Sequence, residues 1–562
     1  MLRQSPIFTA VALGSLALGI GGNTAIFGLI DQVILRSLPV RNHEQLVLLS
    51  THGPYWGLNL GPNTFSYPMY RDIRDHNEVF SGVAARYAID ISVSYRGQNQ
   101  RGRGELVSGN YFEVLGVQPE LGRTFTQFDD SVAGASPLVI LSFDYWQRSF
   151  AADPSILNQT LTINNHPMTI IGVAARGFHG YEVGQPVDVF VPLIMKAQVT
   201  PTWADLDSRK SWWLNVIARL KPTVTRAQAE AATNVLHRQM LQMEIKDIEA
   251  PSEQFRTQYV NQHLGLLPGD KGQSMLREQF SEPLWVLMSM VGLVLLIACA
   301  NLAGLLVARG TARQKEIAIR LSLGASRGRI IRQLLVEGWL LAVCGGTLGL
   351  LVANWTGNAL LNALPFEGLT RQFTAQLDLR ILAFTTVLSL LAGLLFNLVP
   401  AWQSTRPKLA STLKNEAGTA SGTGRQVWLR QVLIIGQIAL SLVLLVGSGF
   451  LVRSLYNLQN VDLGLKSDHL ISFSIDPSQN GYSQVGMRSL FQRLQERLSL
   501  LPGVRAVSMA RFPVLTGDGN RMTIKVEGYR PREDEGMSPV LNFVTILLLD
   551  GNTAHRRPGI HT

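Results

Sequence analysis

Cysteine and charge are both scarce in this chain. Only two cysteines, Cys299 and Cys344, occur among 562 residues, so neither a disulfide framework nor a Cys-x-x-Cys metal site is expected. Asp, Glu, Lys and Arg make up 16% of the residues, whereas hydrophobic residues make up 46%. Because both cysteines fall inside long apolar runs, we expect them to be buried as small apolar side chains.

Motifs for catalysis and nucleotide binding are also missing. The sequence has no Gly-x-x-x-x-Gly-Lys-Ser/Thr phosphate-binding loop, and its ten histidines show no metal-ligand spacing. Residues 324–328 match Gly-x-Ser-x-Gly, but a nucleophile elbow needs a preceding strand and a nearby histidine, and this basic segment offers neither. Asp129 and Asp130 are most simply interpreted as solvated turn residues. We therefore expect no catalytic residue, no cofactor and no metal.

Long apolar runs are what the chain does have. A bilayer core of ~30 Å takes about 20 helical residues, and five runs approach or exceed that length. They cover residues 7–30, 283–308, 338–355, 381–402 and 431–452. The first run is too long for a typical signal-peptide core and lacks a clear cleavage site, so we interpret it as a retained helix rather than a signal peptide.

Basic residues are concentrated in two connectors, 309–332 and 404–430. Short basic loops stay cytoplasmic, and five crossings place both connectors and the N-terminus on the same side of the membrane. The formal charge of +10 therefore indicates membrane orientation, and no nucleic-acid partner is expected. We predict a multi-pass protein of the bacterial inner membrane, with its large domain in the periplasm.

The segment between the first two apolar runs has the composition of a folded α+β domain. Apolar residues alternate on both sides of Asn164-Asn165, which predicts a hairpin, and Thr225 with Gln228 predicts a capping box before a helix over 226–243. The resulting fold class is an α-helical transmembrane bundle of about five helices with an inserted α+β extracytoplasmic domain. The expected segments are helix 1–37, domain 38–281, a three-helix membrane domain 282–403, linker 404–430, helix 431–453, a partial second domain 454–545 and an anomalous tail 546–562.

The chain also shows signs of an internal duplication. Leu2-Arg3-Gln4 precedes the first apolar run, and Leu429-Arg430-Gln431 precedes the fifth. Each run leads to a strand-like and then a helix-like pattern: 46–49 and 67–76 in the first copy, and 471–475 and 487–498 in the second, where 504–509 reads as a further strand. The second copy is shorter, and we hypothesise a reading-frame shift near Thr545, which sequencing of the downstream DNA would test.

The first basic connector predicts a short amphipathic helix at the cytoplasmic membrane surface. One interpretation is an anchor to lipid headgroups, and the other is a docking element for a cytoplasmic protein. The candidate docking residues are Arg313, Lys315, Glu316, Arg320, Gly324, Ala325, Ser326 and Arg327.

Small and polar residues inside the apolar runs predict contacts between helices. Gly345, Gly349 and Ala353 recur every four residues and would allow another helix to approach closely. Asn301 and Asn397 are polar groups at membrane depth, and interhelical hydrogen bonds explain them better than a transport pathway.

Several motifs together resemble a known family. They are Ser5-Pro6-Ile7-Phe8-Thr9, the glycine-rich stretch 16–27, Val107-Ser108-Gly109-Asn110-Tyr111-Phe112, Leu121-Gly122-Arg123 and the basic signature 315–327. This set resembles FtsX-like ABC transporter permeases of the macrolide-exporter (MacB) type, which carry a periplasmic core domain. The duplicated layout is similar to the large orphan permeases in which two such halves are fused.

The resemblance implies partners and a mechanism. A cytoplasmic ABC ATPase would dock on the candidate docking residues, and ATP hydrolysis would move the membrane helices and the periplasmic domain (mechanotransmission). The expected assembly is a permease dimer or pseudo-dimer in membrane lipid, together with a periplasmic adaptor. The chain itself would be a transport subunit and not an enzyme. The alternatives are a non-transporting FtsX-like regulatory scaffold and a truncated, inactive product.

Overall fold

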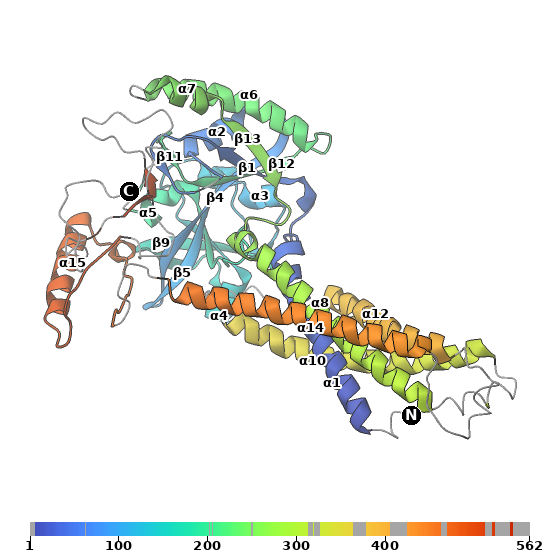
Figure 1. Ribbon diagram of the computed structural model, residues 1–562. Coiled ribbons are helices and arrows are strands. Elements are labelled where there is room, and N and C mark those ends of the chain that lie inside the picture. Colours follow the sequence, from blue (N-terminus) through green and yellow to red (C-terminus); the bar gives the residue numbers. More distant parts are fainter. Residues whose placement is uncertain are drawn as a thin grey trace. The chain divides into compact units, whose positions relative to one another are not determined.

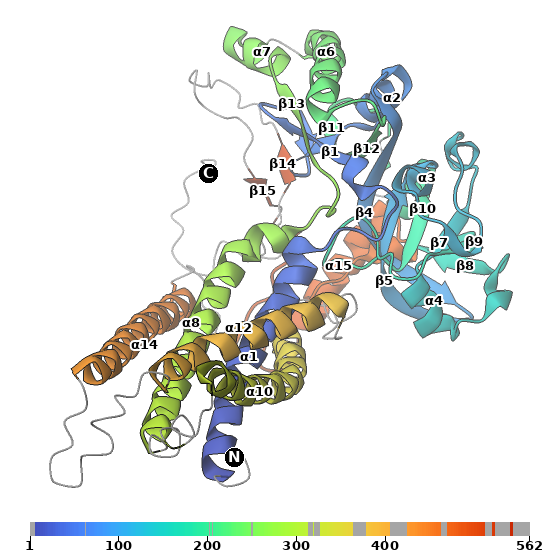
Figure 2. The ribbon, with the colours of Figure 1, turned by 90° about the vertical axis from the view of Figure 1, so that its right-hand side faces the viewer.

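The computed structural model divides the chain into two compact units. The helical unit comprises Met1–Arg36 and Ser274–Ser472, and the sheet unit comprises Ser37–Gln273 and Phe473–Thr562. Figures 1 and 2 show the helices of the first unit and the sheet of the second. The structure describes residues 6–61, 63–201, 203–204, 206–248, 251–312, 319, 326–363, 378–404, 424–461, 469–511, 520–522, 540–542 and 544.

The helical unit is built from long apolar helices that follow the five predicted runs. Its helices are α1 (Pro6–Ile30), α8 (Met275–Ala312), α10 (Arg327–Ala363), α12 (Leu379–Ser404) and α14 (Gly424–Gln459). By length and apolar composition, four described segments could cross a membrane: Pro6–Leu35, Met275–Val307, Val336–Leu360 and Ile434–Gln459. In α12 the apolar segment is Leu379–Leu395, which is shorter than the other four. The fifth crossing therefore stays a prediction.

The core of the helical unit lies where α1, α8, α10 and α12 meet. Leu16 and Ile20 of α1 are fully buried there, together with Ala342 of α10 and Ala392 of α12. Phe27 of α1 stacks on Phe384 of α12, with ring centroids 4.0 Å apart. This core places α1 at the centre of the unit.

The sheet unit contains one large mixed sheet. Within the described ranges it has eleven strands, ordered β13-β1-β12-β4-β5-β10-β7-β9-β6, with β3 paired to β12 and β8 paired to β4 and β9. Their bounds are β1 (Leu46–His52), β3 (Thr64–Phe65), β4 (Phe80–Tyr95), β5 (Gln98–Val107), β6 (Pro119–Gly122), β7 (Leu138–Leu141), β8 (Thr160–Ile163), β9 (His166–Ala174), β10 (Val189–Pro192), β12 (Leu214–Leu220) and β13 (His263–Pro268).

Helices cover this sheet and complete its core. They are α2 (Tyr67–His76), α3 (Tyr111–Leu115), α4 (Phe143–Phe150), α5 (Lys196–Val199), α6 (Arg226–Glu244) and α7 (Glu253–Val260). Helix α6 is fastened to β13 by Asn234, whose side chain both accepts from the Leu264 amide and donates to the Leu264 carbonyl (2.9 and 2.7 Å). In Figure 2 these two elements lie side by side.

Several local predictions for this domain are confirmed. Helix α2 has the predicted bounds, and α6 begins after a capping box formed by Thr225 and Gln228. The predicted hairpin is β8–β9, and Asn164 and Asn165 adopt φ values of 46° and 68° in its turn. Such left-handed residues suit a tight two-residue hairpin because they match the twist of the strands.

The second extracytoplasmic segment is less regular than predicted. Its helix, α15 (Gln484–Ser499), forms as expected, but residues 471–475 and 504–509 are not strands. Those two predictions were wrong because alternation alone does not make a strand without a neighbour to pair with. A short separate sheet instead joins this segment to the first domain, in the order β11 (Ser211–Trp212), β2 (Leu58–Asn59), β14 (Asn520–Met522) and β15 (Val540–Leu541).

Two predictions about single side chains in the helices also need correction. Cys299 is buried, but Cys344 is exposed on α10, so it is not a core residue. Asn301 is likewise exposed on α8, and the side chain of Asn397 lies outside the described part of the chain. An apolar run does not tell which face of its helix meets the neighbouring helices. Cys344 and Asn301 were therefore assigned to the wrong face.

Candidate functional site

Most of the predicted docking segment lies outside the described residues. This holds for Arg313, Lys315, Glu316, Arg320, Gly324 and Ala325. Ser326 is described and directly precedes α10, where its carbonyl accepts a hydrogen bond from the Arg329 amide (3.1 Å). Arg327 is the first residue of α10. The docking role of this segment remains a prediction, but its end leads without a break into a 37-residue helix.

That helix packs closely against α1 through the predicted small residues. A Cβ atom placed on Gly349 would lie 3.2 Å from the Gly21 amide nitrogen and 3.3 Å from the Ala17 carbonyl oxygen. A Cβ atom on Gly345 would lie 2.7 Å from the Cβ atom of Leu16. Contacts of this kind leave no room for a side chain, so glycine lets the two backbones touch. Ala353, one turn further along α10, is buried.

Polar side chains of α1 hold it to the other helices, and the sequence analysis missed them. The Asn23 amide donates to the carbonyl of Gly19 within α1 and to the carbonyl of Val291 on α8, both at 2.8 Å. The hydroxyl oxygens of Thr24 and Thr385 on α12 lie 3.1 Å apart. Two adjacent polar residues inside an apolar run were the signal, because buried polar groups need hydrogen-bond partners.

A charge cluster follows at the end of α1, where the helix widens into a π-helical turn, η2 (Asp31–Leu35). The Asp31 carboxylate is 2% exposed and lies 2.8 Å from the Arg36 guanidinium and 3.2 Å from that of Arg380 on α12. Arg36 also pairs with Asp378, just before α12. Four alternating charges thus tie the exit of α1 to the start of α12. Neither of its two parts, the residues after α1 and those at the start of α12, was predicted, although both lie just outside apolar runs.

A second charge network is buried in the sheet unit. The guanidinium of Arg86 on β4 lies 2.8 Å from the Glu105 carboxylate on β5 and 2.6 Å from that of Glu182, and the Tyr111 hydroxyl donates to Glu105 (3.1 Å). Burial raises the pKa of Glu105 to about 6, against the effect of Arg86. Burial disfavours the Arg86 charge, but Glu105 and Glu182 raise its pKa. This network links strand β5 with the loop that carries Glu182, and we assign it a structural role.

Asp129 and Asp130 are buried, so the prediction of solvated turn residues was wrong. Asp129 accepts from both terminal nitrogens of Arg123 (2.7 and 3.0 Å) and caps the turn that begins after Thr126. Asp130 accepts from the backbone amides of Gly109 and Ile194, and burial raises its pKa to about 6. The backbone donors of Asp130 come from distant parts of the chain, which the local sequence does not reveal, whereas Asp129 is held by the nearby residues Arg123 and Thr126.

Charged and polar side chains of the described residues pair with one another between elements. Within the described ranges, no three His, Cys, Asp or Glu side chains gather closely enough to hold a metal ion. The described features are instead helix contacts and ion pairs that join one element to another.

Two protein families match parts of the chain, one around the large sheet and one in the membrane helices. The MacB-like periplasmic core domain family matches residues 9–235, and the FtsX-like permease C-terminal family matches residues 288–409. The chain thus combines a MacB-like periplasmic core domain with an FtsX-like permease C-terminal domain. The predicted fold class is thereby confirmed: a transmembrane helix bundle with an inserted periplasmic core domain.

Curated relatives of this permease carry related names. The macrolide export ATP-binding/permease protein MacB of Salmonella paratyphi A is 24% identical over 348 residues, which are 60% of this chain and 46% of the relative. A probable export ATP-binding/permease protein of Pseudomonas fluorescens is 24% identical over 301 residues, 53% of this chain and 41% of the relative. The permease thus spans less than half the length of the curated relatives it matches.

Solved structures with some likeness to the permease are extracytoplasmic regions. The periplasmic region of MacB from Actinobacillus actinomycetemcomitans covers 37% of this chain and 95% of its own, with 12% identity and a TM-score of 0.28. The extracellular domain of the noncanonic ABC-type transporter YknZ from Gram-positive bacteria covers 35% of this chain and 94% of its own, with 17% identity and a TM-score of 0.27. Scores this low add nothing to the family matches.

Proposed function

We propose that this chain is the permease subunit of an ABC transporter, in which ATP hydrolysis by a separate cytoplasmic ATPase drives a conformational change of the periplasmic domain. The observation that carries the proposal is a continuous chain of rigid contacts. Helix α10 begins at Arg327, the last residue of the predicted docking segment, and touches α1 at Gly345 and Gly349. Helix α1 then leads through the charge cluster to Ser37, where the sheet unit begins.

The physical basis is that a packed helix moves as a body. Because Gly349 contacts backbone atoms of α1, a shift of α10 along or across this contact has to displace α1. Asp31 in turn couples the end of α1 to α12 through Arg380. An ATPase that pushed on the start of α10 would therefore move the point at which the chain enters the periplasmic domain, without a tunnel for cargo.

The finer parts of the proposal concern assembly. We place the docking surface on Arg313, Lys315, Glu316, Arg320 and Gly324 to Arg327, the chain in the bacterial inner membrane with several crossings, and the working unit as a dimer or pseudo-dimer with a periplasmic adaptor. The relatives named above are export proteins that bind ATP. By analogy with them, export across the membrane is the activity proposed for the complex.

The test is co-purification of an ATPase from native membranes. The variant Arg313→Glu/Lys315→Glu/Arg320→Glu is expected to lose the ATPase subunit and the ATP hydrolysis that elute with the tagged chain. It should still insert in the membrane, because these residues lie in the basic connector and not in an apolar run. Hydrolysis in the eluate and mass spectrometry of its subunits are the two measurements.

The matched control reverses the same number of charges in the other basic connector. The variant Arg406→Glu/Lys408→Glu/Lys414→Glu has an equal change in net charge and should retain the ATPase. Equal retention by both variants would exclude the first connector as the docking surface. Equal loss would mean that the positive charge of the cytoplasmic face, and not a defined site, holds the ATPase.

A further inference from the structure

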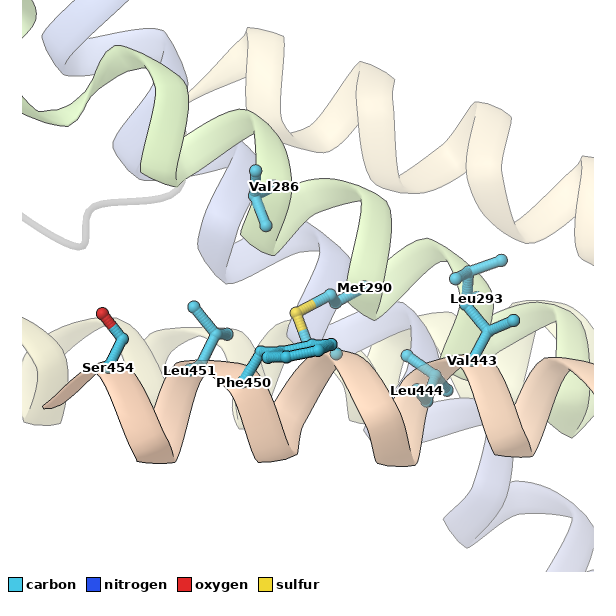
Figure 3. A pocket seen from close by; sticks show the side chains of 9 residues that line it. Val286, Met290, Leu293, Val443, Leu444, Phe450, Leu451 and Ser454 are labelled. Carbon is cyan, nitrogen blue, oxygen red and sulfur yellow. The ribbon is translucent and has the colours of Figure 1, made fainter. Parts of the chain in front are cut away.

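An apolar groove lies between α8 and α14 in the helical unit. It has a volume of about 350 Å³ and is lined by Val286, Met290 and Leu293 of α8 and by Val443, Leu444, Gly447, Phe450, Leu451 and Ser454 of α14. Figure 3 shows Met290 pointing toward the Phe450 ring, with Ser454 near one end of the groove and Leu293 and Val443 near the other. The groove follows the long axis of α14.

Gly447 gives this groove its depth. A Cβ atom placed on Gly447 would have no heavy atom within 4 Å, so the space beside it is open. The groove therefore differs from the α1–α10 contact, where glycines are pressed against another backbone. It is an unfilled apolar space on a helix whose membrane-spanning window is 0% buried.

The size and lining of the groove favour a hydrocarbon chain. A volume of about 350 Å³ is at the lower end of the ~300–1,000 Å³ typical of small-ligand sites. A helix with its side chains is ~10–12 Å wide, so a volume of about 350 Å³ would hold less than one of its turns. All the lining side chains except Ser454 are apolar, and such a surface offers a ligand no hydrogen bonds along its length.

One end of the groove has the composition of a membrane–water interface. Ser454 is the polar lining residue, and the neighbouring Arg453 is exposed. Tyr456 on α14 and Trp285 on α8 are exposed close by in the sequence, at 65% and 51%. Tyrosine and tryptophan gather at the headgroup level of membranes, and arginine pairs with phosphate there. This end of α14 is the one from which the chain continues toward the sheet unit, so the interface is that of the outer leaflet.

We propose that the groove between α8 and α14 binds one phospholipid of the outer leaflet, with an acyl chain along Gly447 and the headgroup phosphate beside Arg453. The charge of Arg453 selects a phosphate-bearing lipid, and the apolar walls take its chain. The proposal requires only that these helices span the membrane, and it is independent of any ATPase. A bound lipid would fill the open side of α14 and hold it against α8.

The experiment uses the full chain reconstituted in vesicles that contain phosphatidylglycerol with a photoreactive diazirine on one acyl chain. After illumination, peptides that contain Met290 and Phe450 are expected to carry the label, and the labelling should saturate and fall when unlabelled phosphatidylglycerol is added. The variant Gly447→Leu, which fills the groove with a side chain, should abolish the saturable part.

Two further variants keep the result specific. Gly449→Leu adds the same side chain to α14 at a glycine that also has no atom within 4 Å but does not line the groove, and it should label like the unaltered chain. Arg453→Gln should weaken labelling by the phospholipid about fivefold, the usual effect of one basic residue at a membrane surface. It should not change labelling by a photoreactive diacylglycerol, which has no phosphate.

Two outcomes would overturn the proposal. Labelling that rises linearly with lipid and is equal in Gly447→Leu and Gly449→Leu would mean contact with bulk bilayer only. Disulfide-linked pairs of Phe450→Cys chains, in a background with both native cysteines replaced by alanine, would assign the groove to a second copy of this chain.

Discussion

Helices α1 and α14 contain similar apolar stretches but are packed in opposite ways. A Leu-Arg-Gln tripeptide stands at residues 2–4, before α1, and at residues 429–431, within α14, and both helices are long and apolar. The membrane-spanning window of α1 is 61% buried within the protein, whereas that of α14 is 0% buried. Hydropathy therefore makes both helices candidates for crossing the bilayer but does not decide which of them becomes the centre of a bundle.

The residues that differ between the two helices explain the contrast. Counted from the shared tripeptide, Gly19 of α1 corresponds to Val446 of α14, and Asn23 corresponds to Phe450. Gly19 and Asn23 are where α1 meets α8: a Cβ on Gly19 would lie 2.9 Å from Leu295, and Asn23 bonds to Val291. Since lipid chains are as apolar as leucine, close packing and hydrogen bonds must hold membrane helices together, and α14 lacks both at these positions.

The sheet unit repeats this contrast between the two copies of the predicted duplication. Helix α2 buries Tyr67, Met69, Tyr70 and Ile73 in the main core, whereas α15, at the corresponding place in the predicted second copy, has no buried residue. A side chain contributes more to stability when more neighbouring residues pack around it. Truncating a side chain should therefore lower the free energy of unfolding much more in α2 than in α15.

The largest difference is expected between matched truncations in α2 and α15. Ile73→Ala opens a cavity in the core and should lower the free energy of unfolding of the sheet unit by about 4 kcal/mol. Leu490→Ala removes a half-buried side chain from α15 and should cost less than ~1 kcal/mol. Urea titration of the full chain in detergent, followed by limited proteolysis, gives both values, and similar losses would contradict the contrast.

The second-largest difference is expected in how stability depends on pH. His237 of α6 is buried, and burial, aided by His263, lowers the pKa of its imidazole from 6.5 to about 4. Between these two pH values the unfolded chain binds a proton that the folded chain does not. The contribution of neutral His237 to the free energy of unfolding is therefore complete above pH 6.5 and is lost as the pH falls toward 4. The loss should be about 3 kcal/mol.

His237→Leu should remove this part of the pH dependence of the urea midpoint. The matched control is His469→Leu, at an exposed residue of the second half, and it should leave the pH profile unchanged. A profile that remains as steep in His237→Leu as in the unaltered chain would show that other groups cause it.

The smallest effect is expected from glycine substitutions in the helical unit. Gly349→Leu forces a side chain against the Gly21 and Ala17 backbone and should destabilise the bundle by about 2 kcal/mol. Gly447→Leu, on α14, meets open space and should be neutral or slightly stabilising. Thermal unfolding in detergent measures both, and a neutral Gly349→Leu would mean that α1 and α10 do not touch as described.

Local signals in the sequence were reliable, because they depend on neighbours along the chain. The capping box of Thr225 and Gln228, the bounds of α2 and the hairpin turn at Asn164-Asn165 are each specified by a few adjacent residues. The apolar runs were equally readable, since a bilayer imposes one length on any helix that crosses it. The family motifs identified both domains from residues alone.

Contacts between distant segments were decided only by the tertiary structure. Asp130 accepts hydrogen bonds from the backbone amides of Gly109 and Ile194, and Cys344 is exposed although it lies inside an apolar run. Residues 471–475 alternate like a strand but have no neighbouring strand to complete them. By itself the sequence determined which segments form long apolar helices. Packing decided which helix face, carboxylate or strand edge acquires a partner, because a partner far along the chain leaves no mark on local sequence.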